Sequence, residues 1–484
     1  MHRCKALRKT EKNMLIFGRN RCNSFLRSTL LLLFSSSVFA SSIHQINFDE
    51  AVRYALNTNP RINASNANID AANAAIIEAR GNNLPKVNLN VNAARSNNPL
   101  NVFSYKLSQG NASFADFGAD KYTGPSALNV MPRALNSPGQ YSNVNTGFAL
   151  SIPIFSGGKS VAAIKKSHYL LNEAQHGNQF ARNELTFDVL QAYEGTRVAN
   201  ELVTVAQQSL RAADSYLKMT KALLHQSLLI ESDVLLAETN RRSAELTLKA
   251  AKTEVSNQLD AFRMLIGNTD NDLVPGNPVN IPLPCDAITV LKNRALSNNP
   301  QLLSLKSHMN ASRAEMSEAN ASNWPQVDLQ LRHDWNANSF ALNGPSNTAL
   351  LNFNWELFSS GAQYGAGKHA LAEYKHAAAE FDNSSNTIKL AVVQAARAAY
   401  IAQQRLEISN QNAEAANKAV KILLQRFGQG IVPLGQLLDS QSRLDTARSQ
   451  RVMERYSMNI ARARLLTLLN EFNPASIQNY RISR

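Results

Sequence analysis

Apolar residues recur at alternating spacings of four and three along two long stretches of this 484-residue chain. The stretches cover 185–224 and 388–427, and small residues such as Ala199 fill many of the repeating positions. This spacing is typical of helices that pack along a coiled-coil seam, and small side chains let neighbouring helices approach closely. The pattern predicts two long helical hairpins, over 159–266 and 362–469.

A sharp turn is expected at the end of each hairpin. The second tip, Phe427 to Asp439, contains three glycines and a proline, which end one helix and allow the next to begin. The first tip, Leu224 to Val234, lies 203 positions earlier and has a related pattern. Matched tips indicate that the chain is duplicated.

Four shorter segments alternate strictly between apolar and polar or small residues, at about 84–95, 144–156, 324–334 and 348–358. This period of two predicts strands with one apolar and one polar face. Any one of them also fits an ordinary half-exposed sheet, but four in an exported chain favour a barrel with lipid outside and water inside. The expected lipid-facing residues are Leu89, Leu150, Leu329 and Phe353, and the expected water-facing residues are Asn90, Ser151, Gln330 and Asn354.

Two constant offsets relate the halves of the chain. The segment 55–60, Ala-Leu-Asn-Thr-Asn-Pro, returns 240 residues later as Ala-Leu-Ser-Asn-Asn-Pro, and from the second strand of each half onward the offset falls to 203. The extra residues must lie in the loop between the first two strands. The predicted organisation is a signal peptide at 1–40, a first repeat at 41–267, a linker at 268–285, a second repeat at 286–473 and a tail at 474–484.

The basic charge is concentrated at the start of the chain. The first 40 residues hold eight Lys or Arg and one acid, a net +7 of the total +14, so the remainder is only mildly basic and gives no reason to expect nucleic acid as a partner. A short apolar run and small residues follow the basic stretch, which predicts a secretory signal peptide. Cys285 alone follows the leader, so no internal disulfide is expected.

The predicted strands require partners. Backbone groups in lipid must all be paired, so membrane strands have to close into a barrel, and four strands are too few. Three copies would supply twelve strands around a water-filled lumen. The expected fold is therefore mainly helical with membrane strands: hairpins that form a helical barrel, and four strands per chain in a trimeric twelve-stranded barrel. A tube continuous with a membrane pore is a conduit.

No catalytic, cofactor-binding or metal-binding pattern emerges from the sequence, and the chain is not expected to be an enzyme. Four histidines lie on predicted helices, but none has acidic partners at metal-ligand spacing. They are His168, His176, His369 and His376.

The order helix, strand pair, long helix, tip and return helix, given twice, resembles the TolC-like outer-membrane efflux proteins. The resemblance covers residues 47–472 and is most specific at the two Asn-Pro segments, at Ile152-Pro-Ile-Phe-Ser-Gly-Gly and at the tips. It implies a homotrimer in outer-membrane lipid, in a Gram-negative cell, that extends into the periplasm. It also implies two protein partners, a periplasmic adaptor and an inner-membrane transporter.

The resemblance also implies roles for residues of the tips. The implied periplasmic gate consists of Ser232, Asp233, Phe427, Gln436 and Asp439, and Val432 stands where some members have a gating arginine. The implied adaptor-docking residues are Ser227, Leu228, Leu229, Gly430, Ile431, Val432 and Pro433. For Asp233 and Asp439, capping of a helix N-terminus is an equally good interpretation.

The leading functional hypothesis is an exit duct of a tripartite efflux pump or a type I secretion system. An exported structural coiled coil or adhesin is the alternative, with the sheet as its attachment domain.

Overall fold

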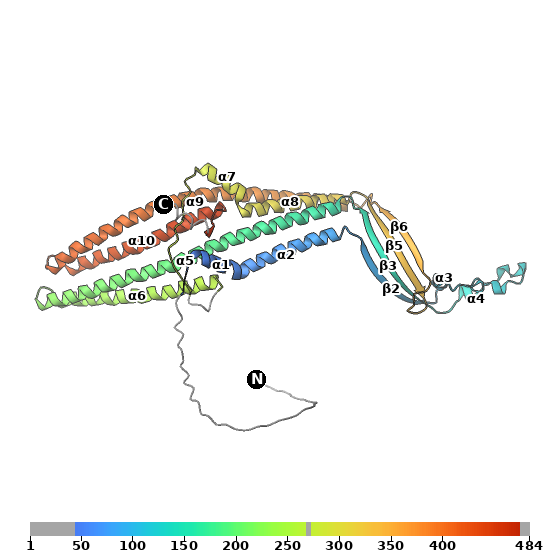
Figure 1. Cartoon of the computed structure of the whole chain (residues 1–484), viewed down its shortest axis with the longest axis horizontal. Helices are drawn as coiled ribbons and strands as arrows, with labels where there is room; N and C mark the ends of the chain where they lie inside the picture. Colours follow the sequence, from blue (N-terminus) through green and yellow to red (C-terminus); the bar gives the residue numbers. More distant parts are fainter. Residues whose placement is uncertain (1–43, 268–272, 475–484) are drawn as a thin grey trace, which may run out of the picture. The chain divides into compact units, whose positions relative to one another are not determined.

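The computed structural model describes residues 44–267 and 273–474 (Figure 1). The expected signal peptide, the start of the linker at 268–272 and the tail from 475 lie outside the described residues. Among the residues that are described, no helix combines the length and the apolar character needed to cross a membrane.

The duplication is confirmed element by element. Helices that correspond in the two halves have equal lengths, with 11, 22, 67 and 35 residues in the four pairs. The first half consists of β1 (His44–Ile46), α1 (Phe48–Thr58), α2 (Pro60–Gly81), β2 (Lys86–Ser96), β3 (Tyr141–Phe155), α5 (Lys159–His225) and α6 (Glu231–Leu265). After β4 (Leu273–Pro275), the second half consists of α7 (Ile288–Asn298), α8 (Pro300–Ala321), β5 (Gln326–Ala337), β6 (Ser346–Asn354), α9 (Ala362–Gly428) and α10 (Leu434–Leu468).

The repeated Asn-Pro segments join three helix ends in each half. Asn59 caps α2 by accepting a 2.9 Å hydrogen bond from Arg61 N, and its side-chain amide donates to Leu265 O at the end of α6. Asn299 does the same for α8 and for Leu468 O at the end of α10. Proline fits the first helical position because the missing N–H has no partner within the helix there.

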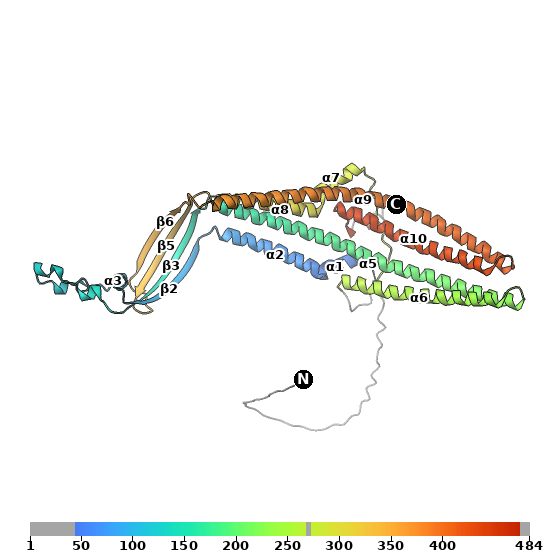
Figure 2. The same cartoon turned by 180° about the vertical axis from the view of Figure 1, so that it is seen from behind.

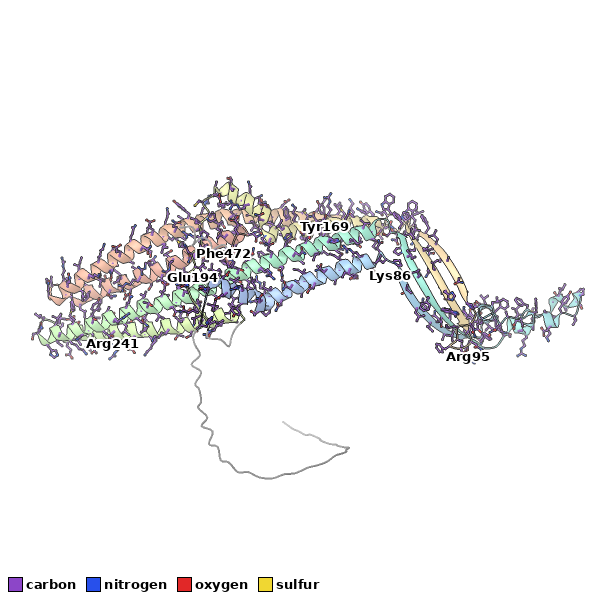
Figure 3. All side chains as sticks on the ribbon, viewed as in Figure 1. Lys86, Arg95, Tyr169, Glu194, Arg241 and Phe472 are labelled. Carbon is purple, nitrogen blue, oxygen red and sulfur yellow. The ribbon has the colours of Figure 1, made fainter. Side chains whose placement is uncertain are left out.

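The four predicted strands form one antiparallel sheet in the order β2-β3-β5-β6. Leu150 lies opposite Leu331, and Leu329 lies opposite Leu351, so apolar residues share one face of the sheet, while Asn90, Ser151 and Gln330 belong to the other. The register thus confirms that the apolar and the polar positions occupy opposite faces of the sheet. Figure 3 labels Lys86 and Arg95 near the two ends of β2, an edge strand.

The connection between β2 and β3 is more ordered than the expected loop. It contains α3 (Pro99–Ser108), three short 3-10 turns and α4 (Arg133–Asn136). Asn98 caps α3 by accepting hydrogen bonds from Leu100 N and Asn101 N, a local signal that the Asn-Pro pair carried in the sequence. The corresponding connection between β5 and β6 is confined to residues 338–345.

The long helices pack as the 4-3 spacing predicted. Every seam position of α5 from Leu185 to Leu224 is buried or half-buried, and so is every seam position of α9 from Ile388 to Phe427. At about 1.5 Å per residue, each of these helices is about 100 Å long. α2 and α8 both contact α5, α8 also contacts α9, and the return helices α6 and α10 complete the hairpins (Figures 1 and 2).

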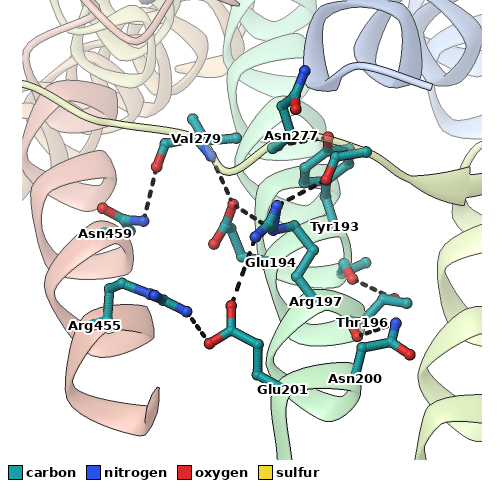
Figure 4. Close-up of polar contacts among 12 residues, drawn as sticks. Tyr193, Glu194, Thr196, Arg197, Asn200, Glu201, Asn277, Val279, Arg455 and Asn459 are labelled. Atoms are coloured by element: carbon teal, nitrogen blue, oxygen red, sulfur yellow. Dashed lines mark hydrogen bonds and ion pairs between the residues drawn. The ribbon is translucent and has the colours of Figure 1, made fainter. Parts of the chain in front are cut away.

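The described part of the linker is held to both hairpins through its backbone. Side chains of α5 and α10 make these bonds to the linker backbone (Figure 4), while the linker's own Val279 and Ile281 are buried in the hydrophobic core. The bonds run from Arg197 Nη1 to Gly276 O (2.8 Å), from Tyr193 OH to Asn277 O (2.9 Å), from Val279 N to Glu194 Oε1 (3.0 Å) and from Asn459 Nδ2 to Val279 O (3.0 Å). Burial raises the pKa of Glu194, and the bond from Val279 N and the charge of Arg197 oppose that shift.

We expect Asn59→Ala to lower the free energy of unfolding by about 1 kcal/mol, because the first turn of α2 loses its cap. Asn59→Asp keeps the acceptor for Arg61 N but removes the donor to Leu265 O, so this variant should lower the free energy of unfolding by a smaller amount. Thermal unfolding of the detergent-solubilised protein measures both. Asn73→Ala, at an exposed position of the same helix, is the control, and an Asn59→Ala protein as stable as this control would contradict the capping role.

Candidate functional site

The two tips have the same backbone geometry. Ser227 and Gly430, which correspond in the repeat, both have positive φ, 62° and 72°. Leu228 N donates to Leu223 O and Ile431 N donates to Arg426 O, each at 3.0 Å. These bonds satisfy carbonyl groups at the helix ends, as a left-handed residue after a helix allows. Ser227 adopts this left-handed conformation although it has a side chain. Glycine would adopt the same conformation without strain.

Apolar side chains at the tips divide into an exposed and a packed set. Leu228 and Ile431 are 58% and 64% exposed, and Ile230, which the sequence analysis did not single out, is 67% exposed. Leu229 and Val432 instead pack against a buried cluster beneath the tips. The cluster draws on all four hairpin helices and consists of Tyr216, Leu223, Ala237, Phe427, Leu434 and Leu437. Ser227, Gly430 and Pro433 are exposed.

The five residues of the implied gate lie in different environments. Phe427 is fully buried in the cluster beneath the tips, so its side chain stabilises the hairpins and could affect a gate only through that packing. Ser232 and Gln436 are exposed. Asp233 is half-buried, and its Oδ2 accepts a 3.3 Å hydrogen bond from Ile230 N, which agrees with its interpretation as a cap at the start of α6.

Asp439 lies one turn beyond the N-terminus of α10 and does not cap it. Its Oδ2 is 2.9 Å from Arg443 Nε, and both side chains are exposed. The four-residue spacing of an acid and an arginine on a helix was visible in the sequence and could have indicated this ion pair. Any acidic ring formed by Asp439 is therefore partly balanced by Arg443.

A buried polar link between the two hairpins was missed by the sequence analysis. Tyr216 OH on α5 donates to Gln441 Oε1 on α10 at 2.7 Å, and Gln441 Nε2 donates to Asp445 Oδ1 at 2.9 Å. Burial and the nearby Asp445 raise the pKa of Tyr216 to about 12, so its hydroxyl stays a donor. Gln441 follows no local motif, so only the packing of α5 on α10 identifies its partner.

Ion pairs on the outside of the hairpins join neighbouring helices. Arg241 on α6, labelled in Figure 3, has its Nε 2.8 Å from Asp214 Oδ1 on α5.

Two of the four helical histidines have charged neighbours. The Nε2 atom of His369 lies 3.9 Å from Glu373 Oε1 on the same helix, an acidic neighbour that the sequence analysis overlooked, and His168 contacts Arg80. Over the described ranges, no three His, Cys, Asp or Glu side chains gather closely enough to hold a metal ion.

The comparisons with known proteins agree with this architecture. A family model described as outer membrane efflux protein matches residues 51–268 and 291–471. A comparison with curated proteins gave no match.

Several solved structures share the fold. The outer membrane protein VceC from Vibrio cholerae is 16% identical with a TM-score of 0.73, over 88% of this chain and 97% of that one. The CmeC outer membrane channel of Campylobacter jejuni is 15% identical with a TM-score of 0.72, over 90% and 88%. The open state of the MtrE outer membrane channel of Neisseria gonorrhoeae is 16% identical with a TM-score of 0.71, over 88% and 89%.

We expect Ser227→Gly to raise the free energy of unfolding by about 1 kcal/mol, because glycine adopts the positive φ at this position without strain. Gly430→Ala should lower it by about the same amount, since a Cβ at Gly430 meets no atom within 4 Å and the cost is purely conformational. Thermal melts of the two variants test the pair. Destabilisation by Ser227→Gly would contradict the assignment of backbone strain to the first tip.

Proposed function

The chain belongs to the outer membrane efflux protein family, and from that premise we propose that it is the exit duct of a tripartite efflux pump or a type I secretion system. One observation carries the proposal: a single chain combines two unlike parts. The first is a sheet that has one apolar face and two open edges, and the second is a pair of hairpins, each about 100 Å long, whose tips expose apolar side chains. The sheet suits a position in the outer membrane, and the hairpins suit a path across the periplasm.

Three copies provide the simplest closed assembly. The smallest membrane barrels have about eight strands, and a lumen wide enough for cargo needs more. Three sheets of four strands give twelve, and the hairpins attached to them form a continuous helical tube. We therefore propose a homotrimer whose barrel contacts outer-membrane lipid.

The tips are the proposed contact with the rest of the machine. Exposed apolar side chains at the end of a tube mark a partner surface, and Leu228, Ile230 and Ile431 provide one on each chain. We propose that a periplasmic adaptor binds this surface and connects the duct to an energised inner-membrane transporter. Export through the expected signal peptide places the chain on the correct side of the inner membrane for that contact.

The proposed role is passive. The matched family and the similar structures are channel proteins, and we propose that this chain has no catalytic activity. Cargo selection and energy then come from the transporter.

The docking proposal predicts that Ile431→Glu and Leu228→Glu abolish export of the pump's substrates while leaving a trimer in the membrane. Both side chains are exposed, so a charge there removes apolar contact without disturbing the buried cluster, whereas Val432 packs against it. Gln429→Glu adds the same charge at a neighbouring exposed position and is the control. Substrate accumulation and in-cell cross-linking to the adaptor are the measurements, and normal export by both variants would exclude the tips as the docking site.

The gate proposal concerns Asp439. Three carboxylates near a symmetry axis attract cations, and Arg443 reduces that attraction. We expect Asp439→Ala to weaken block by divalent cations and raise resting conductance, and Arg443→Ala to strengthen the block. Asp382→Ala, on α9 and far from the tip, should change neither.

Planar-bilayer recording tests the gate, with a thermal melt alongside. If all three variants show the same divalent block and Asp439→Ala only melts earlier, Asp439 is a helix-stabilising residue and not part of a gate.

A further inference from the structure

A hollow of about 540 Å³ lies where the sheet joins the second pair of helices. It is bordered by the end of α8, the segment between β6 and α9, and the first turns of α9. Five of its lining side chains are apolar or aromatic, namely Met316, Leu357, Phe358, Tyr364 and Leu371. Lys368 adds a cation. We propose that this hollow binds a glycerophospholipid of the periplasmic leaflet, with an acyl chain in the hollow and the phosphate beside Lys368.

The hollow continues the apolar face of the sheet. The apolar positions Leu351 and Phe353 of β6 are followed, at the same spacing of two, by Trp355 and Leu357 beyond the end of the strand. Leu357 and Phe358 are 77% and 84% exposed. Exposed apolar side chains grouped in this way mark a contact with a membrane or a partner. Continuity with the face proposed to meet lipid selects the membrane, so the inference rests on the proposed function.

Amphipathic aromatic rings indicate the depth of the hollow in that membrane. Trp324, Trp355 and Tyr364 are all exposed at the junction of sheet and helices. Trp355 Nε1 donates a 3.2 Å hydrogen bond to Asn323 O, so the polar edge of this ring is satisfied by the protein. Rings with one apolar and one polar part collect where acyl chains meet headgroups. A hollow at this level lies within reach of both parts of a phospholipid.

Lys368 provides the charge that a phosphate requires. Its Nζ lies 5.4 Å from the centre of the Tyr364 ring, and its side chain is exposed. Within the described ranges, no carboxylate forms an ion pair with Lys368, whereas Glu356 on the same border accepts a 3.2 Å hydrogen bond from Gln363 Nε2. A lysine ammonium binds phosphate as a point charge. The acyl chain and the phosphate thus have separate contacts.

The repeat shows which residue opens the hollow. Gly367 of α9 corresponds to Ile164 of α5, which is half-buried, so the first half has a branched side chain where the second half has none. The facing residue changes accordingly, because Ile76 of α2 is buried while its counterpart Met316 of α8 is half-buried. A Cβ at Gly367 would lie 3.1 Å from Asn320 Oδ1 on α8. A larger side chain at position 367 would therefore fill the hollow.

Native mass spectrometry of the full-length exported protein in mild detergent, titrated with phosphatidylglycerol, tests the site. Gly367→Leu should weaken lipid binding by about tenfold, because the new side chain takes the place of the acyl chain. Gly365→Leu is the matched control. Gly365 is exposed, borders no part of the hollow, and an added Cβ there meets no atom within 4 Å, so this variant should bind lipid as the natural chain does.

A second pair of variants tests the phosphate contact. Lys368→Gln should weaken binding of phosphatidylglycerol by about tenfold and leave unchanged the binding of a diacylglycerol that has the same acyl chains and no phosphate. Gly367→Leu should weaken both ligands. Lys165→Gln is the control, since Lys165 is the exposed counterpart of Lys368 in the first half.

The outcomes separate the lipid site from the duct. Absence of saturable phosphatidylglycerol binding by the natural protein overturns the lipid site, and so does equal binding by the Gly367→Leu and Gly365→Leu proteins. Equal phosphatidylglycerol binding by the Lys368→Gln and Lys165→Gln proteins overturns the phosphate contact. Planar-bilayer conductance of the natural protein reports on the duct independently, so a conducting protein without the lipid site leaves the proposed function standing.

Discussion

Backbone hydrogen bonding at the edges of the sheet is the constraint on which the rest of this molecule depends. β2 and β6 each have one row of N–H and C=O groups without partners within the sheet. In water such edges invite aggregation, and in lipid each unpaired group costs several kcal/mol. Closure by further copies removes both edges at once. In the proposed trimer, the closed sheet sets the number of copies and places the attached helices around a lumen.

The duplication means that two similar halves of each chain take part in the proposed closed assembly. Two halves with equal helix lengths share one backbone plan, so in the proposed trimer each chain contributes two similar segments to the tube. Small residues along the seams of α5 and α9 let long helices approach closely enough to form a wall. The Asn-Pro corners hold the helices of each half together and the linker bonds hold the two hairpins together, both away from the tips, and the tips remain the proposed contact with a partner.

Much of the architecture could be predicted because it depends on periodicity and local backbone chemistry. The 4-3 and period-two patterns gave the helices and strands to within a few residues, and the offsets of 240 and 203 gave the repeat. The connection between β2 and β3 was predicted as a loop because its Asn, Ser, Gly and Pro content hid a short capped helix.

The tips were harder to predict. Phe427 was assigned to a gate by its position in the family pattern, but its side chain is buried where four helices meet. The bond from Tyr216 to Gln441 joins residues 225 positions apart and left no local pattern. Ser227 could be aligned with Gly430, although its positive φ required the backbone itself. Sequence patterns thus located the two tips, and tertiary packing decides which of their side chains are exposed.

The most direct test of the account is the molar mass of the protein in mild detergent, measured by light scattering with the detergent contribution removed. Closure of the sheet predicts a complex of three chains at all concentrations at which the protein is folded. A folded single chain would leave both sheet edges open, and a two-chain complex would close eight strands around a lumen too narrow for a duct. Either result would contradict the account.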